Sequence, residues 1–266
     1  MSNSQYQVLS NVNNLGAACI ENGDLPQAMH FLRLALQYTK TEITSYPRKQ
    51  TAPYDSGAGE QIEEIGYTLS TLAKQCLSSH PMAENPIDNE DATPDNHQLG
   101  ASARFVYSRG MRMLTTPGDC FSHDLLQDGT IRSAIVVYNL ALLYHLKGVN
   151  DASQVALHKA KHLYEHSYKL LVNTISSFGG GPTGNASVDL LVMALMHNLA
   201  EISLEMSGYY GDTRAMFEHL LQFAVSTTYR GYGDEEVSAF MEQESSYFLL
   251  NATILGLAPA AAAAAA

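Results

Sequence analysis

The stretch NNLGAACIENGDLPQAMHFLRLALQY, residues 13–38, decides the fold of this chain. Apolar side chains recur every three or four residues over positions 8–19, which is the spacing of one face of an α-helix. The spacing stops at the Gly-Asp pair of residues 23–24 and resumes over residues 28–35. Pro26 suits the first turn of the second helix, where its missing N–H is tolerated. Two helices joined by a short polar turn form an αα-hairpin.

The same pattern occurs three times along the 266 residues. It predicts helix hairpins over about residues 5–43, 130–177 and 187–229. Small Gly or Ala residues let the two helices of each hairpin approach closely, and larger residues fill the remaining space. A hydrophobic fraction of 45% is enough to bury a core across the three units, so we expect one folded domain over residues 1–257.

The region between the first two hairpins is less regular. Residues 44–60 hold Pro and Gly and predict a loop, and residues 62–76 return to helical spacing. Residues 81–98 contain three Pro and five acidic residues without Lys or Arg, which predicts an acidic, mobile loop. Residues 103–115 hold two short β-prone runs separated by Arg109-Gly110, a pattern that allows a small β-hairpin.

These hairpins resemble the tetratricopeptide repeat (TPR), a helix-turn-helix unit of about 34 residues. The equivalent leucines of the three copies, Leu15, Leu140 and Leu199, are 125 and 59 residues apart, so the copies are not tandem units. The matching positions are Leu15, Gly16, Gly23, Ala28, Leu32 and Ala35 in the first copy, Leu140, Ala141, Tyr144, Gly148, Leu157 and Ala160 in the second, and Leu199, Ala200 and Gly208 in the third. The resemblance implies an all-α, irregular array of antiparallel helix hairpins, similar to an α-solenoid.

The resemblance also implies a function, because the first helices of TPR hairpins line a groove that binds peptides. We therefore expect a non-catalytic scaffold or adaptor that holds a partner segment on these helices. The residues carried over to this groove or placed beside it are Asn13, Asn14, Ala17, Tyr138, Asn139, Leu142, His145, His197, Asn198, Glu201 and Glu205.

Asparagine occupies the same place in all three copies, directly before Leu-Gly or Leu-Ala. The three residues are Asn14, Asn139 and Asn198. Two interpretations are equally favoured: the amides hydrogen-bond the backbone of a ligand, or they link neighbouring helices.

The charge of the chain bears on its partners. It carries 27 acidic and 15 basic residues, a net charge of −12, and this balance argues against nucleic-acid binding. The first and third groove helices lack Lys and Arg, so a clamp for a peptide's terminal carboxylate is not expected. Glu21, Glu201 and Glu205 favour a neutral or basic protein or peptide partner instead.

The alternative class is an enzyme or a metal-binding protein. Cys120 lies near His123, as in a thiol nucleophile beside its base, and His158, His162 and His166 recur every fourth residue on one predicted helix. The helical triplet spans about 12 Å at 1.5 Å per residue, too far for all three histidines to bind one ion. The chain also lacks the motifs of serine hydrolases, P-loop proteins and zinc proteases. We therefore expect neither catalytic residues nor a cofactor.

The two ends of the chain bear on localisation. The start, MSNSQYQ, does not resemble a secretory signal, and three Cys residues do not suggest a disulfide framework, so we expect a cytoplasmic protein, with the nucleus as an alternative. Residues 245–266 lack charge and are long enough to cross a membrane, but Asn251, Gly256 and Pro259 interrupt them. We instead expect a capping helix over residues 235–257, ended by Pro259 and followed by an Ala-rich tail at 258–266. The partner's identity and the oligomeric state stay open.

Overall fold

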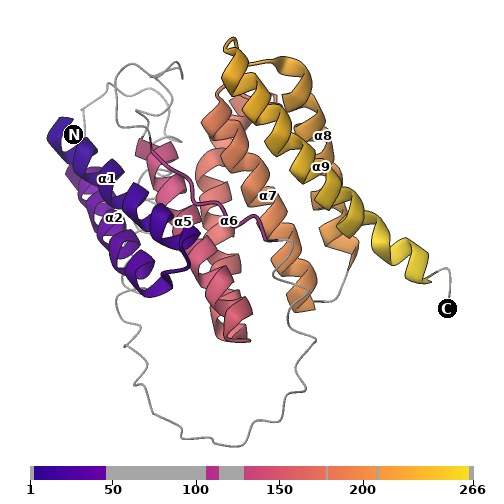
Figure 1. Cartoon of the computed structure of the whole chain (residues 1–266), viewed down its shortest axis with the longest axis horizontal. Helices are drawn as coiled ribbons and strands as arrows, with labels where there is room; N and C mark the ends of the chain where they lie inside the picture. The colour runs from indigo at the N-terminus through magenta and orange to yellow at the C-terminus, as the bar shows by residue number, and fades with distance from the viewer. Residues whose placement is uncertain (1–2, 46–105, 114–128, 178, 208–209, 264–266) are drawn as a thin grey trace, which may run out of the picture.

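The computed structural model describes residues 3–45, 106–113, 129–177, 179–207 and 210–263 (Figure 1). These residues form seven α-helices and no strand, which confirms the prediction of an all-α fold. The helices are α1 (Asn3–Glu21), α2 (Leu25–Ser45), α5 (Gly129–Asn150), α6 (Gln154–Ser177), α7 (Ala186–Ser207), α8 (Tyr210–Arg230) and α9 (Glu235–Ala263).

The helices pack as successive antiparallel pairs. Helix α1 packs on α2, α5 on α6, and α7 on α8, while contacts of α2 with α5 and of α6 with α7 join neighbouring pairs. Helix α9 covers α8 and also touches α7, as expected for an element that caps the array (Figure 1). The order of the pairs in space follows their order in the chain.

The turn of the first hairpin shows how the local sequence fixes the geometry. Gly23 has a φ of 76°, a conformation that costs glycine little, and its N–H donates to the Ile20 carbonyl. The Asp24 N–H bonds the Cys19 carbonyl, which completes the end of α1. The Asp24 carboxylate then accepts the Gln27 N–H at 3.1 Å and caps the start of α2.

Glycine also sets how closely paired helices approach. A Cβ at Gly16 on α1 would lie 2.7 Å from a methyl carbon of Leu32 on α2. A Cβ at Gly148 on α5 would lie 2.6 Å from the matching carbon of Leu157 on α6. In both pairs the leucine fills the space that the missing side chain leaves, so the helices pack without a void.

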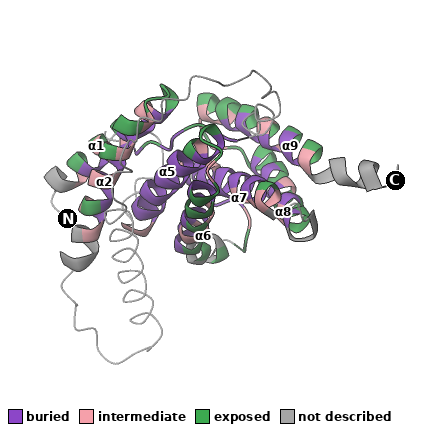
Figure 2. Cartoon of the chain, turned by 90° about the horizontal axis from the view of Figure 1, so that it is seen from below, coloured by how far each residue is buried: buried purple, intermediate pink, exposed green. Residues whose placement is uncertain are grey.

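Helices α5 and α7 are the core of the array. Every residue from Ile131 to His145 on α5 is buried, and most residues of α7 are buried as well, including all of 191–198 (Figure 2). Among the described helices, α7 is long and apolar enough to cross a membrane over Ala186–Met206, at a mean hydropathy of 1.3. In this structure 67% of that window is buried against other helices, which is the position of a core helix.

The structure corrects the predicted end of the last helix. Helix α9 continues through Pro259 to Ala263, so the prediction that Pro259 ends it is wrong. Alanine has the highest helix propensity of all residues, and residues 260–263 are all alanine. The helix therefore continues beyond a proline that lacks one backbone donor.

The structure also corrects the predicted β-hairpin. Its described part, residues 106–113, is one extended segment without strand pairing, and it lies against the helices (Figure 1). Its backbone groups bond side chains instead of a second strand. Several predicted features lie outside the described residues: the helix at 62–76, the acidic loop at 81–98, Cys120 and His123, and most of the loop at 44–60.

Candidate functional site

Three asparagines hold the backbone of residues 106–113, which we call the extended segment. Asn198 on α7 accepts the Tyr107 N–H at 2.9 Å and donates to the Tyr107 carbonyl at 3.1 Å. Asn139 on α5 makes the same two bonds with Met111, at 2.7 and 2.8 Å.

The third asparagine repeats this arrangement at the other end of the segment. Asn14 on α1 bonds both backbone groups of Met113, each at 2.7 Å. We call Asn14, Asn139 and Asn198 the asparagine clamp. A carboxamide carries one acceptor and one donor side by side, so each one satisfies an N–H and a C=O together.

Further polar groups extend the clamp along the segment. The Tyr138 hydroxyl contacts the Arg109 carbonyl at 3.4 Å, and Asn13 donates to the Met111 carbonyl at 3.0 Å. The contacted residues 107, 109, 111 and 113 alternate, as expected for extended chain in which every second residue faces the same side. These contacts involve only backbone atoms of the segment, so they depend on its extended conformation and not on its side chains.

Side chains at one end of the segment meet an acidic residue of α9. The Glu244 carboxylate accepts the Tyr107 hydroxyl at 2.7 Å and pairs with the Arg109 guanidinium at 2.6 Å. The Glu244 side chain is only 4% exposed, whereas that of Arg109 is 55% exposed. The Tyr107 ring is also close to Phe248, with ring centroids 4.8 Å apart.

The other end of the segment meets α1. Arg112 pairs with Glu21 at 2.5 Å, and both side chains are partly exposed. Gly110 lies so close to α1 that a Cβ there would be 2.7 Å from the Ala17 Cβ and 2.8 Å from its Cα. The Ala17 Cα belongs to a helix backbone and cannot yield, so the segment requires glycine at position 110.

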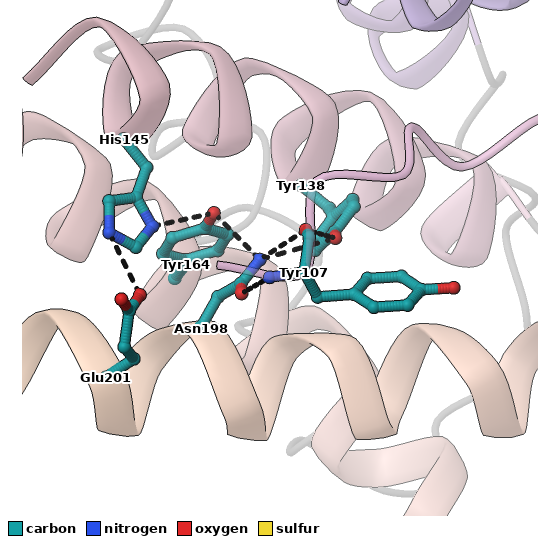
Figure 3. Close-up of polar contacts among 6 residues, drawn as sticks. All are labelled: Tyr107, Tyr138, His145, Tyr164, Asn198 and Glu201. Carbon is teal, nitrogen blue, oxygen red and sulfur yellow. Dashed lines mark hydrogen bonds and ion pairs between the residues drawn. The ribbon is translucent and has the colours of Figure 1, made fainter. Parts of the chain in front are cut away.

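A buried polar network lies behind the clamp (Figure 3). Asn198 donates to the Tyr164 hydroxyl oxygen at 3.1 Å, and Tyr164 contacts His145 Nδ1 at 3.4 Å. His145 Nε2 then lies 3.2 Å from a carboxyl oxygen of Glu201. Apart from that contact, neither oxygen of Glu201 has a hydrogen-bond partner within the described part of the chain.

Burial governs the protonation of this network. Desolvation, assisted by the nearby His197, lowers the pKa of His145 to about 3. Desolvation, assisted by Glu205, raises the pKa of the Glu201 carboxyl well above its usual value. His145 is therefore neutral at pH 7, and burial favours the protonated, neutral form of Glu201. Their side chains are 0% and 5% exposed, so the network supports the clamp from inside and has no open contact with solvent.

The candidate residues named from the sequence fall into three groups in the structure. Those that contact the extended segment are Asn13, Asn14, Ala17, Tyr138, Asn139 and Asn198. Those buried elsewhere in the core are Leu142, His145, His197 and Glu201, and Glu205 is exposed. Glu201, which the sequence predicts to face a ligand, turns its carboxyl toward His145 in this structure. Binding of a separate partner stays a prediction.

Sequence reasoning missed the residues on the other side of this contact. The sequence allows a β-hairpin at residues 103–115 and predicts a capping helix that contains Glu244, but it predicts no contact between the two. Gly110 was the signal that could have predicted this contact. A glycine inside an extended run is typical of a close approach by another backbone as well as of a turn.

The three histidines of α6 that the sequence singles out do not converge on one point. His162 and His166 lie with their Nε2 atoms 3.1 Å apart, and desolvation, together with the nearby His162 and Lys169, lowers the pKa of His166 to about 4. His158 is exposed. Among the residues that the structure describes, no group of three or more His, Cys, Asp or Glu side chains is arranged to hold a metal ion.

In comparisons with protein families, curated proteins and solved structures, no family model, curated protein or solved structure matched this chain.

Proposed function

We propose that this protein is a non-catalytic interaction scaffold that holds an extended polypeptide segment across α1, α5 and α7. The asparagine clamp is the observation that carries this proposal. It presents three carboxamides in a row, one from each hairpin, and each is matched to one residue of extended backbone. The resemblance to TPR hairpins, whose first helices line a peptide groove, supports the same conclusion.

The chemistry of the clamp favours recognition over catalysis. Its polar groups are hydrogen-bonded to backbone, and the buried ionisable pair His145 and Glu201 is closed off behind it. Backbone recognition accepts many sequences, because every residue except proline offers the same N–H and C=O. In this proposal a partner segment takes the position that residues 106–113 occupy in the described structure.

The test uses a chain whose own segment is displaced. Gly110→Val places a branched side chain against the Ala17 backbone, so the extended segment should leave the clamp while the helices remain. A fluorescent peptide with the sequence of residues 105–114 is then titrated into this chain and followed by anisotropy. We expect saturable binding. The matched control is Ser108→Val, a similar substitution at an exposed neighbour, which leaves the segment in place and should bind the peptide at least about tenfold more weakly.

Two further chains make the result decisive. Adding Asn139→Ala to Gly110→Val removes two clamp bonds and should weaken peptide binding about tenfold or more. If Gly110→Val loses its helical circular dichroism, a chain with residues 106–113 replaced by Gly-Pro repeats takes its place, because proline at positions 107, 111 and 113 lacks the N–H that the clamp bonds. The proposal would be contradicted by a helical Gly110→Val chain that does not bind the peptide. It would also be contradicted if adding Asn139→Ala left peptide binding unchanged.

A further inference from the structure

The extended segment carries a specific chemical pattern in addition to its backbone. Its sequence is VYSRGMRM, with two arginines and no acidic residue, in a chain whose net charge is −12. Both arginines are paired, Arg109 with Glu244 and Arg112 with Glu21. The clamp face therefore carries an acidic residue near each end, on α9 and on α1.

A steric requirement lies between the two charges. Position 110 faces Ala17 at a distance that excludes any side chain, so only glycine fits there. The apolar residues on either side, Tyr107 and Met111, are 4% and 7% exposed and fill the remaining space. The face thus selects an arginine, a glycine directly after it, and a second arginine two positions later.

We propose that the partner of this scaffold is an extended Arg-Gly-x-Arg segment of another protein, and that residues 106–113 are an internal copy of this ligand. The proposal rests on the proposed function above and adds to it the chemical class of the partner. Glu244 and Glu21 select the two arginines, Ala17 selects the glycine, and the asparagine clamp holds the backbone between them.

The internal segment, residues 106–113, determines how concentrated a separate ligand must be to displace it. The extended segment and the helices that hold it belong to one chain, with fifteen residues between Met113 and the start of α5 at Gly129, so the segment binds intramolecularly and competes with any separate ligand. A separate ligand therefore binds the intact chain only when its concentration exceeds the effective concentration of the segment or when it makes additional contacts. The partially exposed ion pairs contribute mainly to selectivity and association rate.

The experiment varies the peptide on the Gly110→Val chain. The parent peptide, residues 105–114, is compared with versions carrying Gly110→Val or Arg112→Glu. We expect the valine peptide to bind more than about 100-fold more weakly than the parent, and the glutamate peptide about tenfold more weakly. A Glu21→Arg substitution in the chain should restore binding of the Arg112→Glu peptide, which a purely structural role of Glu21 would not do.

A random decapeptide display library selected on the same chain identifies the preferred class directly. Enrichment of Arg-Gly-x-Arg supports the proposal. Binding of the parent peptide with no preference for arginine or glycine overturns this inference and leaves the backbone clamp intact. Failure of the parent peptide to bind overturns the proposed function itself. Light scattering of the intact chain measures its mass in solution. A dimer that dissociates when the Gly110→Val substitution is introduced would mean that the segment of a second copy occupies the clamp, and this result would also overturn the inference.

Discussion

At the scale of single residues, the paired hydrogen bonds of asparagine carry the recognition. Asn139 is fully buried and bonds both backbone groups of Met111 as well as the side chain of Asn13. Removing a buried partner leaves the opposing groups without hydrogen bonds, which costs more than the bond itself contributes.

We therefore expect Asn139→Ala to lower the free energy of unfolding by about 1–3 kcal/mol. Asn139→Asp keeps the acceptor for the Met111 N–H but loses the donor, and should destabilise by a comparable amount because the carboxylate then faces two acceptors. Urea denaturation followed by circular dichroism measures both. Asn11→Ala, at an exposed position on α1, is the control and should change stability by less than about 0.5 kcal/mol. Equal stabilities for all three chains would show that the clamp bonds contribute little.

A second prediction concerns Glu201, whose folded pKa is raised by burial. A carboxyl with a raised folded pKa binds more protons in the folded state than in the unfolded state above about pH 4.3, so it loses stability as pH rises. The glutamine of the Glu201→Gln variant cannot ionise, so the variant does not lose stability in this way. We expect the free energy of unfolding of the variant to rise relative to that of the wild type by up to about 1.4 kcal/mol for each pH unit above about pH 4.3. This increase ends at the pH where the carboxyl ionises in the folded protein.

Chemical denaturation at several pH values between 4 and 8 measures this difference. His145 is present in both chains, so its own contribution, whose depressed pKa favours the folded state at higher pH, largely cancels in the comparison. Glu242→Gln, at an exposed position of α9, should follow the wild type across the range. A Glu201→Gln curve parallel to the wild type would mean that Glu201 is ionised in the folded protein.

At the scale of elements, local sequence predicted the helix pairs well because helical periodicity and Gly or Pro punctuation are short-range signals. Gly23 and Asp24 close the first hairpin through bonds to residues within five positions. The extended segment could not be assigned in the same way. Extended chain alternates its faces whatever it pairs with, so residues 106–113 resemble a strand although their partners are asparagines on three separate helices.

The close helix contacts supply a prediction at this scale. Gly16→Ala places a Cβ within 2.7 Å of Leu32 and should destabilise the first hairpin by about 1–3 kcal/mol. Leu32→Ala alone removes a fully buried side chain and should cost about 2–5 kcal/mol. The double variant relieves the overlap, so its loss should be smaller than the sum of the two single losses. Thermal denaturation of the four chains gives the coupling, and strict additivity would show that the two side chains do not meet.

At the scale of the whole molecule, the extended segment connects helices that are otherwise far apart in sequence. It bonds α1, α5 and α7 through the clamp and reaches α9 through Glu244, so one stretch of eight residues touches all three helix pairs and the cap. The sequence indicated the receiving side of this contact through three asparagines in equivalent positions. It could not identify the occupant, since no local pattern links residue 111 to residue 139.

Limited trypsin digestion tests whether this connection holds in solution. Arg109 and Arg112 have side chains that are 55% and 56% exposed, yet their backbone is held by the clamp and is cleaved only after the segment opens. Combining Asn14→Ala, Asn139→Ala and Asn198→Ala should raise the rate of cleavage after both arginines by more than about tenfold, because opening then breaks fewer bonds. Mass spectrometry identifies the cut sites, and circular dichroism confirms that the helices persist. Unchanged cleavage after these arginines in a folded triple variant would mean that the apolar contacts of Tyr107, Met111 and Met113 hold the segment without the asparagines.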